Sequence, residues 1–156
     1  MTKPIPDGYH TVTPYLIVKD VAAAIDWYSK AFGAEDILRM TAPDGKNILH
    51  AEIKIGDSHV MLGEENPEWQ SKGPKMLGGT PVTLHIYVED VDTAFQKAVD
   101  AGAEATMPVA DQFWGDRYGK ITDPYGHHWS IGTHIADPTP EEMQAAMIEA
   151  FAQKQN

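Results

Sequence analysis

The stretch Phe113-Trp-Gly-Asp-Arg-Tyr-Gly-Lys-Ile-Thr-Asp-Pro-Tyr-Gly-His-His-Trp-Ser130 decides how the rest of the chain is interpreted. Asp123-Pro-Tyr-Gly126 has the composition of a tight turn, because Asp favours the first position, Pro fixes φ at the second and Gly tolerates a positive φ. Strand-like runs flank this turn, so Arg117–Thr122 and His127–Thr133 predict a β-hairpin. Phe113-Trp-Gly115 precedes the hairpin in a loop, and its two large rings should cover either the core or a ligand pocket.

The chain before this hairpin shows an internal repeat. Val18-Lys-Asp-Val21 matches Val88-Glu-Asp-Val91, and Phe32-Gly-Ala-Glu35 matches Ala101-Gly-Ala-Glu104, both at an offset of about 70 residues. Each copy predicts strand, helix and three further strands. The first copy is expected as strand Val12–Val18, helix Val21–Phe32 and strands Asp36–Thr41, Ile48–Ile55 and His59–Leu62. The second is expected as strand Val82–Val88, helix Val91–Ala101, strand Ala103–Met107 and the hairpin.

This pattern predicts one domain over residues 1–137, with module one at about 12–63 and module two at about 82–134. Residues 64–81 form a long linker, of a length that is usually mobile or functional. A C-terminal helix is expected within 138–156, because Thr139 and Glu142 fit a capping box and Pro140 suits the first helical position. Its apolar stripe of Met143, Met147 and Phe151 indicates packing either on its own domain or across a dimer.

Composition excludes several functions. The net charge of -11 argues against nucleic acid and anionic membranes as partners, since both attract basic surfaces. The chain contains no cysteine, which removes disulfides, thiolate catalysis and cysteine-based zinc sites and is compatible with a cytoplasmic location. Neither a signal-peptide core nor a run of transmembrane length is present.

A duplicated β-α-β-β-β unit with these motifs resembles the vicinal oxygen chelate superfamily, which includes glyoxalases, dioxygenases and bleomycin-resistance proteins. Thr13-Pro-Tyr-Leu-x-Val18, Trp27-Tyr-x-x-Ala-Phe-Gly33 and Phe113-Trp-Gly-Asp-Arg-Tyr-Gly119 are similar to its PhnB-like or bleomycin-resistance-like branch, as is Asp123-Pro-Tyr-Gly-His-His-Trp129. The resemblance implies an α+β fold in which two tandem βαβββ modules form a cup-shaped mixed sheet. It also implies a homodimer that binds a small molecule.

The resemblance also bears on metal binding. In the metal enzymes of this superfamily, ligands stand at four equivalent stations, which correspond here to Thr13, Met61, Thr83 and Ser130. None of these is a histidine or a carboxylate, and hydroxyls are poor sole ligands for a transition metal. The usual metal site therefore is expected to be missing, although a register slip of two residues would place His85 at one station.

Strand alternation selects the side chains that should face the cavity. On Val82–Val88 the apolar residues fall on one side, whereas Thr83, His85 and Tyr87 fall on the other. The other strands alternate in the same way between apolar and polar side chains, and Phe113 and Trp114 would lie at the rim. Together they give a polar and aromatic face of the kind found at small-molecule sites. The candidate ligand-binding residues are Trp114, Phe113, Tyr15, His85, Tyr87, His50, Glu52, Met61, His128 and Ser130.

Structural roles stand beside these ligand-binding roles. His50 and Glu52 could bond to each other or to Lys54 on a wet sheet face, and His127-His128 could be an exposed pair after the turn. Asp116 and Arg117 favour a loop-fixing salt bridge over a role as acid or ligand clamp.

Three functions follow as hypotheses. The leading one is a metal-independent binding protein of bleomycin-resistance type, without catalytic residues or cofactor, that sequesters an aromatic or cationic molecule. The alternative is a metal-dependent lyase or dioxygenase-like enzyme whose displaced site draws on His50, Glu52, His85 and His128. The third is an interaction protein whose linker and C-terminal helix bind another chain.

Overall fold

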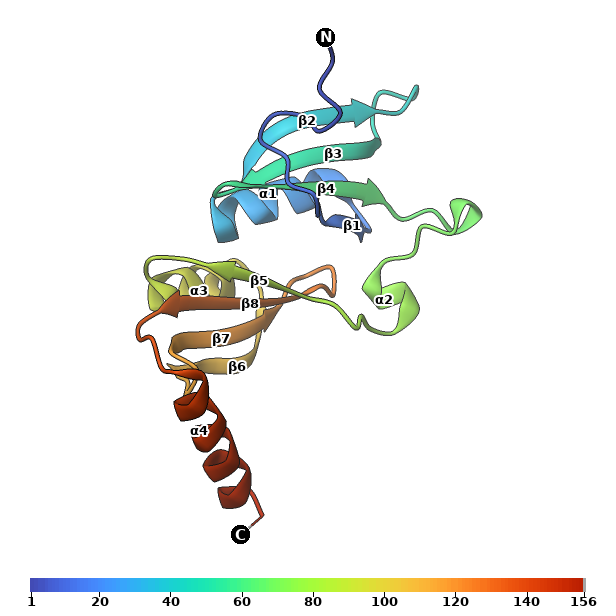
Figure 1. Cartoon of the computed structure of the whole chain (residues 1–156). Helices are drawn as coiled ribbons and strands as arrows, with labels where there is room; N and C mark the ends of the chain where they lie inside the picture. The colour runs from blue at the N-terminus through green and yellow to red at the C-terminus, as the bar shows by residue number, and fades with distance from the viewer. Residues whose placement is uncertain (156) are drawn as a thin grey trace.

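A computed structural model describes residues 1–155, and it shows two similar halves joined by a long connection (Figure 1). The elements are β1 (Tyr15–Val18), α1 (Val21–Phe32), β2 (Glu35–Thr41), β3 (Ile48–Ile55), β4 (Ser58–Glu64), a 3₁₀ turn (Pro67–Trp69), α2 (Pro74–Leu77), β5 (Thr83–Tyr87), α3 (Val91–Asp100), β6 (Glu104–Asp111), β7 (Asp116–Thr122), β8 (His128–His134) and α4 (Pro140–Gln153).

Each half is a four-stranded mixed sheet with one covering helix. The strand order is β1-β4-β3-β2 in the first sheet and β5-β8-β7-β6 in the second. In both, the first strand runs parallel to the last, and the other pairs are antiparallel. The predicted α+β fold of two tandem βαβββ modules followed by a C-terminal helix is confirmed. Several strand boundaries differ from the predicted ones by one to four residues, most of all in β6.

The repeated tetrapeptides form equivalent helix starts. Asp20 caps α1 by accepting a hydrogen bond from the backbone N–H of Ala23 at 3.0 Å, and Asp90 caps α3 through Thr93 at 3.1 Å. Gly33 ends α1 with φ of 67°, a conformation that costs a glycine little. Local capping chemistry, readable in the sequence, therefore sets where both helices begin and where α1 ends.

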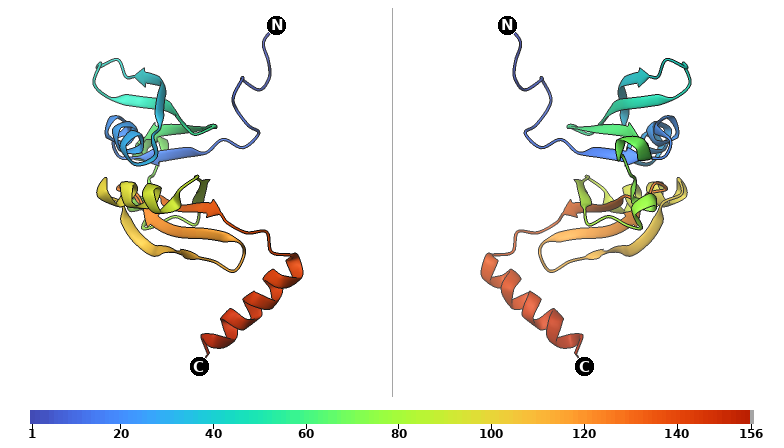
Figure 2. Two further views of the ribbon diagram at one scale, coloured as in Figure 1. Left: turned by 90° about the vertical axis from the view of Figure 1, so that its left-hand side faces the viewer. Right: turned by 90° about the vertical axis from the view of Figure 1, so that its right-hand side faces the viewer.

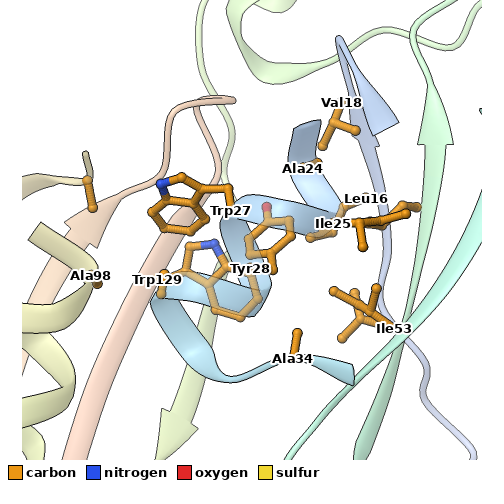
Figure 3. Close-up of a cluster of buried hydrophobic side chains, with 14 of the residues drawn as sticks. Leu16, Val18, Ala24, Ile25, Trp27, Tyr28, Ala34, Ile53, Ala98 and Trp129 are labelled. Carbon is orange, nitrogen blue, oxygen red and sulfur yellow. The ribbon is translucent and has the colours of Figure 1, made fainter. Parts of the chain in front are cut away.

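The two modules share one hydrophobic core, which surrounds α1. The ring of Tyr28 on α1 is fully buried and lies 5.6 Å from that of Trp129 on β8 (Figure 3). Trp27 donates a hydrogen bond across the junction to the carbonyl of Ala101 at 2.8 Å. Helices α1 and α3 lie side by side at this junction (Figures 1 and 2), so each sheet turns its apolar face inward and leaves its other face free of helices.

Asp123, the first residue of the predicted turn, holds this junction. Its carboxylate is 3% exposed and accepts hydrogen bonds from the Tyr28 hydroxyl at 2.5 Å and from Trp129 Nε1 at 2.8 Å. It also accepts the backbone N–H groups of Tyr125 and His127, both at 2.9 Å. One side chain thus closes the hairpin turn and joins helix α1 to the second module.

The linker and the C-terminal helix add smaller features. Residues 64–81 contain the 3₁₀ turn and α2, so the linker is partly helical. Helix α4 carries the predicted capping box, but it projects away from both modules, and Met147, Ile148 and Phe151 are exposed. Packing of α4 on its own domain, one of the two predicted alternatives, is therefore wrong. Over residues 1–155, no helix has the length and apolar character that crossing a membrane requires.

We predict that Asp123→Ala lowers the free energy of unfolding by about 3–5 kcal/mol, because it leaves several buried donors without an acceptor. Asp44→Ala is the matched control: Asp44 also accepts two backbone N–H groups in a hairpin turn but is exposed. Asp44→Ala should lower the free energy of unfolding much less than Asp123→Ala does. Urea denaturation followed by tryptophan fluorescence measures both, and similar losses in the two variants would contradict the structural role given to Asp123.

Candidate functional site

The open face of the second sheet carries a cluster of rings, which we call the aromatic face: His85, Tyr87, Phe113, Trp114 and Tyr118. The His85 ring lies edge-on to Tyr87 at 4.5 Å and stacks on Tyr118 at 5.7 Å. Trp114 meets Tyr118 edge-on at 5.3 Å, and Phe113 meets Trp114 at 5.2 Å. The structure therefore brings together four of the rings predicted for ligand binding, adds Tyr118 to them and places Ser130 against His85.

A glycine allows His85 to lie flat across this face. Gly132 stands opposite Tyr87 on the neighbouring strand, and a Cβ atom placed on it would come within 3.1 Å of His85 Cε1. Ser130, directly opposite His85 on β8, places its Oγ 2.7 Å from His85 Nδ1 and fixes the ring by a hydrogen bond. Partial burial lowers the pKa of His85, which favours the neutral ring.

Asp116 supports the aromatic face from beneath. Its carboxylate is buried and accepts hydrogen bonds from the Tyr87 hydroxyl and from Trp114 Nε1, both at 3.1 Å, and from His134 Nδ1 at 2.8 Å. Burial by itself raises the pKa of Asp116, but the three hydrogen bonds outweigh it and lower that pKa overall. The carboxylate thus stays charged and holds two of the rings in place.

The predicted pairing of Asp116 with Arg117 is wrong. Arg117 instead binds Asp92 on α3 in a bidentate manner, at 2.7 and 2.8 Å, and Asp111 at 2.9 Å. Sequence reasoning missed the positions of Asp116 and Tyr118 on the aromatic face. The alternation of side chains along β7 is the signal that identifies them, since it puts both on the same side.

The open face of the first sheet carries a second group, the Glu52 face: Tyr15, His50, Glu52 and Met61. The Tyr15 hydroxyl lies 2.9 Å from His50 Nδ1, and His50 Nε2 lies 3.5 Å from Glu52 Oε1. Met61 stands opposite both Tyr15 and Glu52 on the neighbouring strands. Tyr9, from the segment before β1, donates a hydrogen bond to the other oxygen of Glu52. The contact expected between His50 and Glu52 is present, but it is long.

The predicted residues therefore form two groups, and no hydrogen bond or ring contact within residues 1–155 joins them. His128 lies on β8 beside Thr83, at the margin of the aromatic face, and is half-buried. Residues 1–155 contain no group of three or more histidine or carboxylate side chains placed to hold a metal. In one chain, the four residues considered for a displaced metal site do not converge.

A cleft of about 870 Å³ opens between the modules, but it differs from the predicted cavity. Of the predicted residues, only His85 and Tyr87 line it. Its apolar wall includes Phe32, Ile86 and Trp129, which belong to the shared core. The cleft is therefore lined by residues of the shared core and lies beside the outer edge of β5. The aromatic face and the Glu52 face remain the better candidates for a ligand site.

Comparison with known proteins places this arrangement in a family. Residues 9–131 match the model of the Glyoxalase/Bleomycin resistance protein/Dioxygenase superfamily, and the chain belongs to that superfamily. An uncharacterized protein of Mycobacterium tuberculosis H37Rv is 48% identical over 139 residues, which cover 87% of this chain and 81% of the relative.

Solved structures agree with this assignment. TioX from Micromonospora sp. ML1 is 29% identical, with a TM-score of 0.65 over 81% of this chain and 99% of TioX. The PhnB protein from Bacillus cereus is 17% identical, with a TM-score of 0.62 over 80% of this chain and 99% of its own. The predicted superfamily is confirmed, and the likeness to the PhnB protein shows that the two chains share a fold.

His134 gives a pH-dependent prediction. Its ring joins Asp116 and Asp137, each at 2.8 Å, and hydrogen bonds to Asp137 and then Asp116 raise its pKa. Because the folded pKa is raised, the added stability is complete below the unfolded pKa of about 6.5 and is lost as pH rises through the folded value. His134→Gln should therefore lower the Tm most near pH 5.5 and progressively less at higher pH.

Thermal unfolding between pH 5.5 and 8.5 measures this difference. His10→Gln, a change at an exposed histidine, serves as the control and should shift the Tm by a similar small amount at every pH. A loss of Tm in His134→Gln that does not vary with pH would count against a charged His134 between the two carboxylates.

Proposed function

We propose that this protein is a metal-independent binding protein that sequesters a small aromatic or cationic molecule against the aromatic face. The observation that carries this proposal is the set of rings fixed by Asp116. A half-buried Trp114 and an exposed Tyr87 both donate hydrogen bonds to one buried carboxylate, so these rings are ordered before any ligand arrives. Preordered rings bind a planar molecule with little loss of conformational entropy.

The chemistry of the face favours binding over catalysis. Rings present their electron-rich faces to flat or positively charged ligands, through stacking and cation–π contact. Asp116 is the buried carboxylate there, and its three donors already occupy it. It is therefore poorly placed to take a proton from a substrate, and the rings are the groups left to interact with one.

We propose further that two copies of the chain complete the cavity. Strands β1 and β5 end their sheets, so each leaves one edge without a strand partner. Met61 N–H donates to the carbonyl of Pro14, and Val88 N–H donates to that of Gly132. In a parallel pair the intervening residues turn their backbone groups to the outer edge. Tyr15 and His85 do so, whereas the carbonyl of Ile17 already accepts a hydrogen bond from His127 Nε2 at 2.8 Å.

Such edges favour association with another chain. If the β1 edge of one copy lies along the β5 edge of another, the Glu52 face of one copy and the aromatic face of the other become two walls of one cup. Such a pair would be the homodimer that the family resemblance implies, and it would give the two separate groups of predicted residues a common cavity.

The ligand-binding proposal is tested at Trp114. We expect Trp114→Ala to weaken binding of the planar cation proflavine about tenfold, because a stacking ring and its contact area are lost. Isothermal titration calorimetry measures the affinity. Trp69→Ala is the matched control, since Trp69 is an exposed linker tryptophan away from both faces, and it should leave the affinity unchanged. Equal affinities in the two variants would exclude Trp114 as a ligand contact.

The shared cavity is tested by mixing two defective chains. Tyr15→Ala damages only the Glu52 face and Trp114→Ala only the aromatic face, so each homodimer should bind proflavine weakly. A heterodimer has one cup with both defects and one cup with neither. Co-expression with two affinity tags should therefore restore normal affinity at one site per heterodimer. A heterodimer that remains defective at both sites would place each cavity within a single chain.

A further inference from the structure

Glu52 is an anion without a matching cation. Its side chain is 17% exposed and stands between Leu38 and Met61 in the register of the sheet. Among the described residues, the only basic group within 4 Å is His50, at 3.5 Å, and no lysine or arginine pairs with it. A half-buried carboxylate normally has a charged partner or several hydrogen bonds, and Glu52 has little of either.

The donor that does reach Glu52 comes from the N-terminal segment. The Tyr9 hydroxyl donates to Glu52 Oε2, and that hydrogen bond, partial burial and the negative charge together raise the pKa of Tyr9 to about 12. The proton therefore stays on Tyr9 at neutral pH. A neutral phenol satisfies one lone pair of the carboxylate but does not neutralise its charge.

Few contacts hold the N-terminal segment in this position. The Tyr9 ring stacks on His59 with centroids 4.1 Å apart, and His59 Nδ1 donates to the carbonyl of Gly8 at 2.9 Å. Residues 1–8 are otherwise exposed, which is typical of segments that open at low free-energy cost.

Space for a ligand group exists beneath this segment. A cavity of about 520 Å³ lies between it and the sheet, and Ile5, Tyr9, Glu52 and Met61 contribute to its lining. Apolar walls with one carboxylate suit an ammonium or amidinium attached to a hydrocarbon or ring.

We infer that Glu52 receives the positively charged group of the ligand and that Tyr9 is an internal competitor, which occupies Glu52 until that group displaces it. This inference rests on the proposed function and specifies its ligand as an organic cation. Because Tyr9 must leave, the apparent affinity of the cation is lower than its intrinsic affinity for the open form. Removing the Tyr9 hydroxyl should therefore strengthen binding, whereas a simple pocket-lining role would weaken it.

The experiment compares 2-phenylethylammonium with the neutral 2-phenylethanol, using the full chain. Tyr9→Phe should bind the ammonium roughly three- to tenfold more tightly, the range expected for one hydrogen bond, and should bind the alcohol as before. Tyr15→Phe is the matched control, because it removes a hydroxyl from the same face that bonds to His50 instead. It should bring no gain. In Glu52→Gln the preference for the ammonium should disappear, and adding Tyr9→Phe should not restore it.

Displacement itself is read from the His59 ring in NMR titrations. Tyr9→Ala gives the resonances of His59 without the stacked ring, and the ammonium should move the wild-type resonances toward that position. Weaker or unchanged ammonium binding in Tyr9→Phe, or bound ammonium with unmoved His59 resonances, overturns the inference. If Trp114→Ala weakens proflavine binding while the ammonium and the alcohol bind equally, the proposed function stands and the role of Glu52 fails. If instead Trp114→Ala leaves proflavine binding unchanged while the ammonium binds more tightly than the alcohol, the role of Glu52 stands and the role of Trp114 fails.

Discussion

The contact on which the rest of the structure depends is the buried junction of Tyr28, Asp123 and Trp129. It fixes α1 against the second module as well as its own sheet, so that the helices fill the space between the two sheets. A charged group buried there would be costly without partners, and four hydrogen bonds supply them. Since the helices cover the inner faces, no helix covers the other face of either sheet, and only the N-terminal segment reaches the one that carries Glu52.

Much of this arrangement can be predicted from the sequence, because its determinants are local. Asp20 and Asp90 cap their helices through hydrogen bonds from residues three positions on, and Asp123 closes its turn through residues two and four positions on. The alternation along β5 correctly separates Leu84 and Ile86 from His85 and Tyr87. Caps, turns and strand faces follow from near neighbours in the chain, and for that reason one sequence suffices to place them.

The failures concern how distant parts meet. Alternation predicts which side chains share a face of one sheet. It does not predict whether the faces of two sheets meet within one chain, because that depends on the packing of Tyr28 against Trp129, about 100 positions away. The role of Tyr9 could not be predicted either, because a segment rich in proline has no periodicity that relates it to a surface. Likewise, α4 has an amphipathic pattern and a capping box, and neither specifies what its apolar side contacts.

The repeat makes the two walls of the proposed cup chemically different at matching positions. In the first sheet the cross-strand row runs Leu38, Glu52, Met61, Tyr15, and in the second the equivalent row runs Met107, Lys120, Ser130, His85. An acid on one wall therefore corresponds to a base on the other. If the proposed cup binds an aromatic cation, the charge would be drawn to Glu52 and repelled from Lys120, while the attached ring would stack on Trp114 and Tyr118. The same duplication that builds two similar sheets would thus give the proposed cup a direction, with the charge of an aromatic cation at Glu52 and its ring at Trp114.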